Sequence, residues 1–231
     1  MTELSWLGVI RHGESTANAA ADRAEASGLE VIEVAERDAD VPLSPTGETQ
    51  ARALGKMLPE MHPELVLSSP YRRAVQTAQL AVDGAVPIRL DERLRDRELG
   101  ILDLLTRHGV AVRHPAEATR RARLGAFYYR PPGGEAWTDV TLRLRGVLRD
   151  LREGYPDGRV LIVAHEAVVL LLRYLVEELT EADVLGFAAA RLHNASLTSW
   201  TRVGDRLRLV TFNDTGHLSE AGVEVTRQAH V

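Results

Sequence analysis

The sequence predicts an α/β fold, because short buried strands alternate along it with amphipathic helices. Apolar runs such as 159–165 (RVLIVAH) are typical of buried strands, and 133–154 places its apolar residues at helical spacing. The 231 residues, 45% hydrophobic and 26% charged, have the composition of an ordinary globular domain. We therefore expect a single domain over residues 1–231, without internal repeats or low-complexity linkers.

The first strand is expected at 6–12 (WLGVIRH), an apolar run that ends in a polar tripeptide. A helix is expected over 43–58, where Ser44 can cap the N-terminus and Pro45 suits the first turn. The later elements expected are, in chain order, a strand at 64–69, a helix through 72–81, a helix within 133–154, a strand at 159–165, a buried helix over 166–179 and two late strands within 195–212. The late strands are expected to join at Gly204-Asp205.

Two segments fit this alternation less well. Residues 19–41 separate the first strand from the helix at 43–58, and we interpret them as a flap or an insertion. Residues 101–132 are rich in arginine, and we expect them to be partly helical and to form a lid. Both segments are expected to belong to the same single domain.

The composition argues against several classes of protein. A net charge of -5, from 28 basic against 33 acidic residues, argues against a nucleic-acid-binding protein. The absence of cysteine removes disulfides, thiolate zinc sites and cysteine nucleophiles. No apolar run approaches the ~20 residues of a membrane helix, and the first residues do not resemble a signal peptide. We expect a cytoplasmic protein, a monomer or a homodimer, with no nucleic-acid or membrane partner.

Basic side chains follow three of the predicted strands, at the point where each strand ends. They are Arg11 and His12 beside Gly13, then Arg72 and Arg73 after Ser69, and finally His165. Because ligands of open α/β sheets bind at the carboxyl ends of the strands, we expect these side chains to converge. Arginine binds phosphate oxygens in bidentate fashion, so the sequence predicts an anion pocket. The two histidines lack the spacing of metal ligands, and the arginines would repel a cation, so no metal is expected.

Six motifs resemble, in order, those of the histidine phosphatase superfamily, which includes the phosphoglycerate mutases. The motifs are RHGESTAN, PLSPTGETQARALG, SSPYRRAVQTA, LRDRELG, VLIVAHEAV and NASLT, and they span nearly the whole chain. The tripeptide RHG alone is a weak signal, whereas six ordered motifs are a specific one. The resemblance implies a phosphoglycerate mutase-like fold: a three-layer sandwich whose mixed, mostly parallel sheet is covered by helices on both faces.

The resemblance also implies the roles of the basic residues. His12 would be the nucleophile that attacks phosphorus and carries a phosphohistidine. Arg11, Arg73 and His165 would bind the phosphoryl oxygens and stabilise the charge of the transition state. Arg73 is preferred to Arg72 because of its place in the motif. No metal or other cofactor is needed, because the required cations are side chains.

The acid that protonates the leaving oxygen is expected at Asp96, which falls on the family's acid position counted back from Gly100. Glu98 and Glu166 remain alternatives. Acidic residues recur through 91–98, and such a run is usually a solvated face. Glu166 directly follows the second histidine, where some branches of the superfamily keep an acid.

Further residues are expected to line the substrate pocket: Gly13, Ser15, Asn18, Arg130 and Glu166. For Ser15 and Asn18 the alternative is capping of a helix start. The partner they imply is a small-molecule phosphomonoester.

A closer resemblance links FYYRPPGGEAWTDVTLRLRGVLRDL and VLIVAHEAVVLLLRYL to the bisphosphatase domain that degrades fructose 2,6-bisphosphate. Three residues depart from that branch: Trp137 replaces a tyrosine, Glu166 a glutamine and Leu170 the arginine that holds the distal phosphate. The resemblance therefore implies the chemistry without that substrate. We expect a metal-independent phosphomonoester hydrolase that acts on a small phosphorylated metabolite. The alternatives are a phosphoglycerate mutase-type phosphomutase and a non-catalytic binding protein on the same fold.

Overall fold

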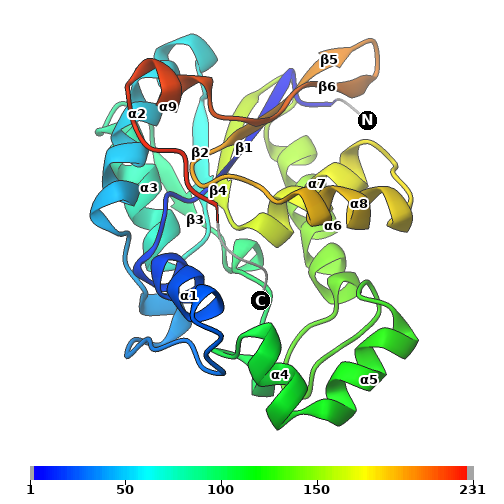
Figure 1. The fold of residues 1–231 in the computed structure, drawn as a ribbon. Coiled ribbons are helices and arrows are strands. Elements are labelled where there is room, and N and C mark those ends of the chain that lie inside the picture. The colour runs from blue at the N-terminus through cyan, green and yellow to red at the C-terminus, as the bar shows by residue number, and fades with distance from the viewer. Residues whose placement is uncertain (1–2, 228–231) are drawn as a thin grey trace.

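The computed structural model describes residues 3–227, which contain one six-stranded mixed sheet (Figure 1). The strands lie in the order β3-β2-β4-β1-β5-β6. Their bounds are β1 Trp6–Arg11, β2 Leu65–Ser68, β3 Ile88–Leu90, β4 Arg159–Ala164, β5 Leu197–Val203 and β6 Arg206–Asp214. Strands β1 to β4 are parallel, and the β5–β6 hairpin extends the sheet in antiparallel fashion. The predicted α/β class with a mixed, mostly parallel sheet is confirmed.

The register of the sheet brings the ends of three strands together. Both β1 and β2 pair with β4 in parallel, so that Arg11 lies beside Ala164 and Ser68 lies beside Val163. The residues that follow these three strands therefore leave the sheet at the same edge, where ligands of α/β sheets bind.

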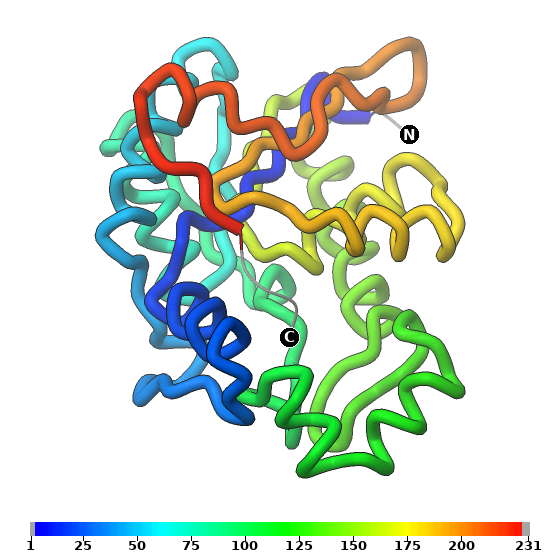
Figure 2. The backbone as a smooth tube through the Cα atoms, in the orientation of Figure 1, coloured from blue at the N-terminus to red at the C-terminus, as the bar shows by residue number. Residues whose placement is uncertain are grey.

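Helices cover both faces of the sheet, as Figure 2 shows from the path of the backbone. One face carries α2 (Pro45–Met61), α3 (Arg72–Val82) and α9 (Gly216–Glu220), and the other carries α6 (Trp137–Gly154), α7 (Glu166–Val176) and α8 (Glu181–Ala190). Side chains of β1 alternate between the two hydrophobic cores: Leu7 and Val9 face α6 and α7, whereas Trp6 and Ile10 face α2 and α3. The predicted three layers are thus confirmed. No helix within residues 3–227 has the length and apolar character needed to cross a membrane.

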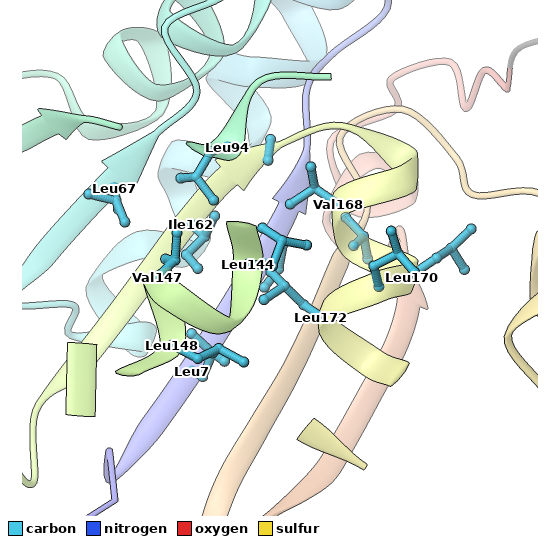
Figure 3. Close-up of a cluster of buried hydrophobic side chains, with 14 of the residues drawn as sticks. Leu7, Leu67, Leu94, Leu144, Val147, Leu148, Ile162, Val168, Leu170 and Leu172 are labelled. Carbon is cyan, nitrogen blue, oxygen red and sulfur yellow. The ribbon is translucent and has the colours of Figure 1, made fainter. Parts of the chain in front are cut away.

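Helix α6 shows how the sequence pattern produces a buried face. Its apolar side chains at helical spacing are all buried, namely Val140, Leu144, Val147, Leu148 and Leu151. Figure 3 shows Val147 and Leu148 of α6 turned toward the sheet and Leu144 turned toward α7. Burying a leucine or valine side chain stabilises a fold by roughly 1.5–3 kcal/mol, so this face anchors the helix. The helix begins at Trp137, where the Asp139 carboxylate accepts the Ala136 N–H at 2.8 Å.

The two segments that fitted the alternation poorly lie on the same side of the molecule (Figure 1). Residues 19–41 contain most of α1 (Thr16–Ala26) followed by an irregular stretch, and residues 101–132 contain α4 (Arg107–Arg113) and α5 (Pro115–Leu124). The backbone N–H of Ile32 donates to the carbonyl of Leu104 at 2.8 Å, so the two segments are joined to each other. The sequence pattern did not indicate α8 or β3, since α8 is rich in alanine and β3 spans only three residues.

Candidate active site

The loop after β1 is held by close backbone packing. The N–H of Gly13 donates to the hydroxyl of Thr77 on α3 at 3.0 Å, and that hydroxyl donates to the carbonyl of Arg73 at 2.7 Å. A Cβ added at Gly13 would lie 2.6 Å from the carbonyl oxygen of Gly47, the residue at which α2 receives its Ser44 cap. Glycine is therefore required at both positions, because the loop and the start of α2 are in backbone contact.

His12 is held in one tautomer. Its Nδ1 lies 2.7 Å from the carbonyl oxygen of Gly13 and must carry the proton, so Nε2 keeps its lone pair. The Nε of Arg73 donates to this Nε2 at 3.3 Å. Burial, followed by the positive charges of Arg73, His165 and Arg11, lowers the pKa of His12 well below its ordinary value. The side chain is thus a neutral imidazole, the form that acts as a nucleophile.

Arg73 contacts acids from two other segments. Its Nη1 donates to the backbone carbonyl of Asp38 at 2.6 Å and to the Asp38 carboxylate at 2.9 Å. Its Nη2 donates to the carboxylate of Asp96 at 3.3 Å. The guanidinium lies 5.1 Å from the centre of the Tyr71 ring. Arg73 is buried within this cluster, whereas Arg72 is exposed on the outside of α3.

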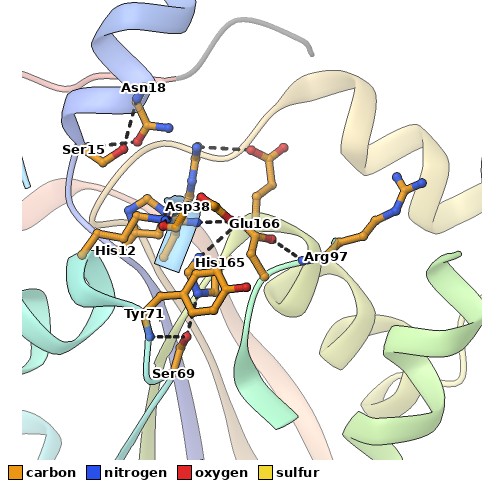
Figure 4. Close-up of polar contacts among 12 residues, drawn as sticks. His12, Ser15, Asn18, Asp38, Ser69, Tyr71, Arg97, His165 and Glu166 are labelled. Atoms are coloured by element: carbon orange, nitrogen blue, oxygen red, sulfur yellow. Dashed lines mark hydrogen bonds and ion pairs between the residues drawn. The ribbon is translucent and has the colours of Figure 1, made fainter. Parts of the chain in front are cut away.

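His165 lies beside His12 at the start of α7, and their ring centres are 5.1 Å apart (Figure 4). Its Nε2 is 2.8 Å from the hydroxyl of Ser69, and its Nδ1 is 3.3 Å from the Asp96 carboxylate. Burial lowers the pKa of His165, and the negative charge of Asp96 opposes that effect only in part.

Asp96 is the acid that faces both His165 and Arg73. Burial raises the pKa of its carboxyl, but the interactions with His165, Arg73 and the backbone N–H of Arg97 outweigh burial and hold the pKa well below the ordinary value. Without substrate this carboxyl is therefore ionised.

The two alternative acids have different partners. Glu98 is exposed, and it accepts the hydroxyl proton of Tyr71 at 2.9 Å. Glu166 forms an ion pair with Arg11 at 3.2 Å (Figure 4). Arg11 itself is fully buried and also donates to the carbonyl of Leu192.

The charged side chains surround a small cavity of about 140 Å³. Its lining includes Arg11, His12, Ser15, Asn18, Asp38, Arg73, Asp96, Arg97, Glu98 and Glu166. The structure therefore brings together the predicted nucleophile, the arginines and the candidate acids from distant parts of the chain. In residues 3–227 no group of three or more histidine, aspartate or glutamate side chains is arranged to hold a metal ion.

Comparison with known proteins agrees with this arrangement. A family model described as "Histidine phosphatase superfamily (branch 1)" matches residues 7–215. The chain belongs to the histidine phosphatase superfamily.

Relatives within the superfamily include phosphatases. The chain is 27% identical over 212 residues to the "uncharacterized phosphatase PhoE" of Bacillus subtilis, covering 91% of this chain and 95% of that protein. It is 31% identical over 197 residues to the glucosyl-3-phosphoglycerate phosphatase of Mycobacterium tuberculosis, covering 78% and 86%. A structure of the mycobacterial glucosyl-3-phosphoglycerate phosphatase with VO3 has a TM-score of 0.73 and 29% identity, over 91% of this chain and all of that chain. The chain is a histidine phosphatase-type hydrolase.

Not all of the predicted pocket residues of this histidine phosphatase line the cavity. Ser15 and Asn18 line the cavity and also cap α1, so the capping alternative and the pocket placement hold together. Asn18 in addition accepts the side-chain N–H of Asn194 at 3.2 Å. Arg130 is not among the residues that line the cavity: it is exposed and forms an ion pair with Asp139 in the first turn of α6.

Sequence reasoning did not indicate several residues of the site, among them Asp38, Tyr71 and Thr77. Asp38 falls within the 19–41 segment that was interpreted only as a flap, and nothing in its surroundings marks it as a partner of Arg73. Thr77 and Tyr71 lie inside a recognised motif, SSPYRRAVQTA, but neither is a residue type that identifies a catalytic role by itself. The motif nevertheless predicted that this segment of the chain lies at the site.

Proposed function

We propose that this hydrolase cleaves phosphomonoesters through a phosphohistidine formed on His12. The observation that carries the proposal is the buried, neutral imidazole whose unprotonated Nε2 accepts from Arg73 and lies at a cavity lined by Arg11 and Arg73. An imidazole without a proton on Nε2 is a nucleophile, and two guanidiniums hold the anionic group that it attacks. The imidazole of His165 lies beside that of His12 and is a third nitrogen-bearing side chain next to the two arginines.

In the first step the Nε2 lone pair of His12 attacks phosphorus. The P–N bond forms as the bond from phosphorus to the ester oxygen breaks, and the departing oxygen takes a proton from the carboxyl of Asp96. Arg11, Arg73 and His165 donate to the three remaining phosphoryl oxygens. Because charge accumulates on these oxygens and on the leaving oxygen, fixed donors stabilise the transition state more than the bound substrate.

The protonation of the Asp96 carboxyl depends on the bound substrate. In the free site the pKa of this carboxyl is low, because Arg73 and His165 both contact it. A bound phosphoryl group shares those same donors and adds its own negative charge next to Asp96. Both effects raise the pKa of the carboxyl, so the acid is generated where and when the leaving oxygen needs it.

In the second step water hydrolyses the phosphohistidine. The ionised Asp96 takes a proton from the water as its oxygen attacks phosphorus, and the P–N bond breaks with its electron pair returning to Nε2 of His12. The products are inorganic phosphate and the alcohol released in the first step. The site then returns to its starting protonation when the phosphate leaves.

Phosphate release from a panel of phosphomonoesters, in EDTA, tests the proposal. The wild type is expected to turn over members of the panel, and His12→Ala is expected to lose at least about 1,000-fold in kcat, as nucleophile deletions do. Glucosyl-3-phosphoglycerate belongs in the panel, because a phosphatase with that name is a relative. Circular dichroism verifies that the variant is folded. Substantial activity of folded His12→Ala would contradict the mechanism.

Three conservative variants assign the acid. Asp96→Asn is expected to lower kcat far more for an ester with a poor alkoxide leaving group than for p-nitrophenyl phosphate, whose leaving group needs little protonation. Glu98→Gln and Glu166→Gln are the comparison variants. If one of these two shows the leaving-group dependence instead, that residue is the acid and the assignment to Asp96 is wrong.

A further inference from the structure

A second cavity opens directly from the catalytic one. Its volume is about 520 Å³, compared with about 140 Å³ for the cavity around His12. The two share four lining residues, Asp96, Arg97, Leu99 and Glu166. The larger cavity adjoins the one that holds His12 and offers more room for the part of a substrate beyond its phosphoryl group.

The larger cavity has an apolar wall built from the core helices. Trp137 at the start of α6 and Leu170 on α7 are buried side chains whose edges line it, and Leu185 of α8 lines it as well. The wall suits a carbon skeleton or the apolar face of a ring.

Four arginines line the same cavity: Arg97 next to Asp96, Arg107 at the start of α4, Arg121 on α5 and Arg191 at the end of α8. Among residues 3–227 none of the four forms an ion pair with a carboxylate. Two nearby arginines that are not among the lining residues do form ion pairs, since Arg95 and Arg143 both pair with Glu135.

The four guanidiniums are also close enough to influence one another. Burial and then the charge of Arg121 lower the pKa of Arg97 to about 10. Burial also lowers the pKa of Arg191; the negative charge of Glu166 opposes this effect, and the charge of Arg107 adds to it. In Figure 4 the Arg97 side chain extends away from the two histidines. The two acids of the cavity, Asp96 and Glu166, are already paired with Arg73 and Arg11.

Arginines that line an apolar cavity without an ion-pairing carboxylate of their own favour a ligand that supplies the counter-charge. We propose that the larger cavity binds the leaving group, and that the leaving group of the natural substrate carries a second anionic group at the far end of its carbon skeleton. This inference rests on the proposed function, because it assumes that phosphoryl transfer occurs in the adjoining cavity. Carboxylate and phosphate share the chemistry that arginine recognises, and the experiment below distinguishes them.

Binding of phenylphosphonates tests the inference without relying on turnover. The three probes are phenylphosphonate, 4-carboxyphenylphosphonate and 1,4-phenylenebisphosphonate, which differ only in the para substituent, and their P–C bonds offer no leaving oxygen. Isothermal titration calorimetry is expected to show at least a tenfold lower Kd for an anionic probe than for phenylphosphonate. The tighter of the two anionic probes identifies carboxylate or phosphate as the preferred group.

Matched arginine variants locate the effect. Arg121→Gln and Arg191→Gln are each expected to reduce, at least fivefold, the affinity that the para anion adds over phenylphosphonate. Arg120→Gln and Arg123→Gln lie on the same helix α5, are exposed and line neither cavity, so they are expected to keep the gain. The inference would be overturned if the para anion lowered the Kd of the wild type by less than twofold. It would also be overturned if all four variants lost this affinity gain equally.

Turnover of phenyl phosphate and 4-carboxyphenyl phosphate separates this inference from the proposed function. If neither ester is hydrolysed, the proposed chemistry fails for these esters even where the phosphonates show the expected preference. If both are hydrolysed with equal kcat/KM and the phosphonates bind equally, the chemistry stands and the second anion site is wrong.

Discussion

Thr77→Val tests whether the loop that carries His12 is held by one buried hydroxyl. Valine keeps the shape of the side chain but cannot accept the N–H of Gly13, which Thr77 accepts at 3.0 Å. The Gly13 residue is buried, so its donor would be left without a partner. An unsatisfied buried donor costs about 1–3 kcal/mol, and we expect the free energy of unfolding to fall by about 2 kcal/mol. For a chain of this size each kcal/mol lowers Tm by roughly 2–4 °C.

Thr141 supplies the matched control. Both threonines are buried in a helix and donate to the carbonyl four residues earlier, at 2.7 Å from Thr77 and at 2.8 Å from Thr141. That carbonyl also accepts a backbone N–H in a helix, so losing the hydroxyl there costs little. Thr141→Val is therefore expected to change stability by less than about 0.5 kcal/mol. Urea unfolding of both variants measures the difference, and a difference below about 0.5 kcal/mol would refute the reasoning.

Three further predictions concern charge and backbone contact. Burial lowers the pKa of His12 in the folded protein, so as the pH falls the unfolded chain takes up a proton on this side chain before the folded protein does. The contribution of His12 to stability is therefore fully present above the unfolded pKa of about 6.5 and falls as the pH drops below that value. Urea unfolding at pH 7.5 and 5.0 should show a smaller loss in His12→Asn than in the wild type, and an equal loss would count against a buried neutral imidazole. Arg73→Gln removes a charge that lowers the pKa of His12, so NMR of the ring nitrogens should show that pKa rise; an unchanged or lower value is the contrary result. A Cβ at Gly47 would lie 1.9 Å from the carbonyl oxygen of Glu14, so Gly47→Ala should lower Tm by several degrees, whereas Gly186→Ala has open space in α8 and should leave Tm unchanged or raise it. Equal Tm values for the two alanine variants would contradict the close contact.

The residues that carry charge after each strand were predictable because two independent features coincide there. A buried apolar run indicates a strand, and the parallel register carries the residues after β1 and β4 to one edge. His12 and His165 were found in this way, and the structure places their rings 5.1 Å apart. The mixed, mostly parallel sheet and the three layers followed from the resemblance rather than from local pattern.

The contacts of the flap and of Arg130 were not predictable from pattern. Asp38 lies in an irregular stretch whose path is fixed by tertiary contacts, including its own bonds to Arg73, so no local periodicity marks it. Arg130 lies in a motif that resembles a substrate-binding one, yet its partner is Asp139, nine residues along the chain. Sequence identifies which groups are present, whereas the choice between two nearby partners depends on distances that only the fold defines.

The two arginines of the site are already paired with carboxylates of the protein, and this pairing affects turnover. Arg73 is shared by Asp38 and Asp96, and Arg11 is paired with Glu166. A phosphoryl group that enters competes with these carboxylates for the arginine donors, so part of its interaction with the arginines is offset by the contacts that weaken. In the proposed mechanism the inorganic phosphate produced in the second step meets the same competition, which favours its release. The transition state carries charge on the leaving oxygen as well, which the proton of Asp96 neutralises, so it gains a stabilisation that neither substrate nor product receives.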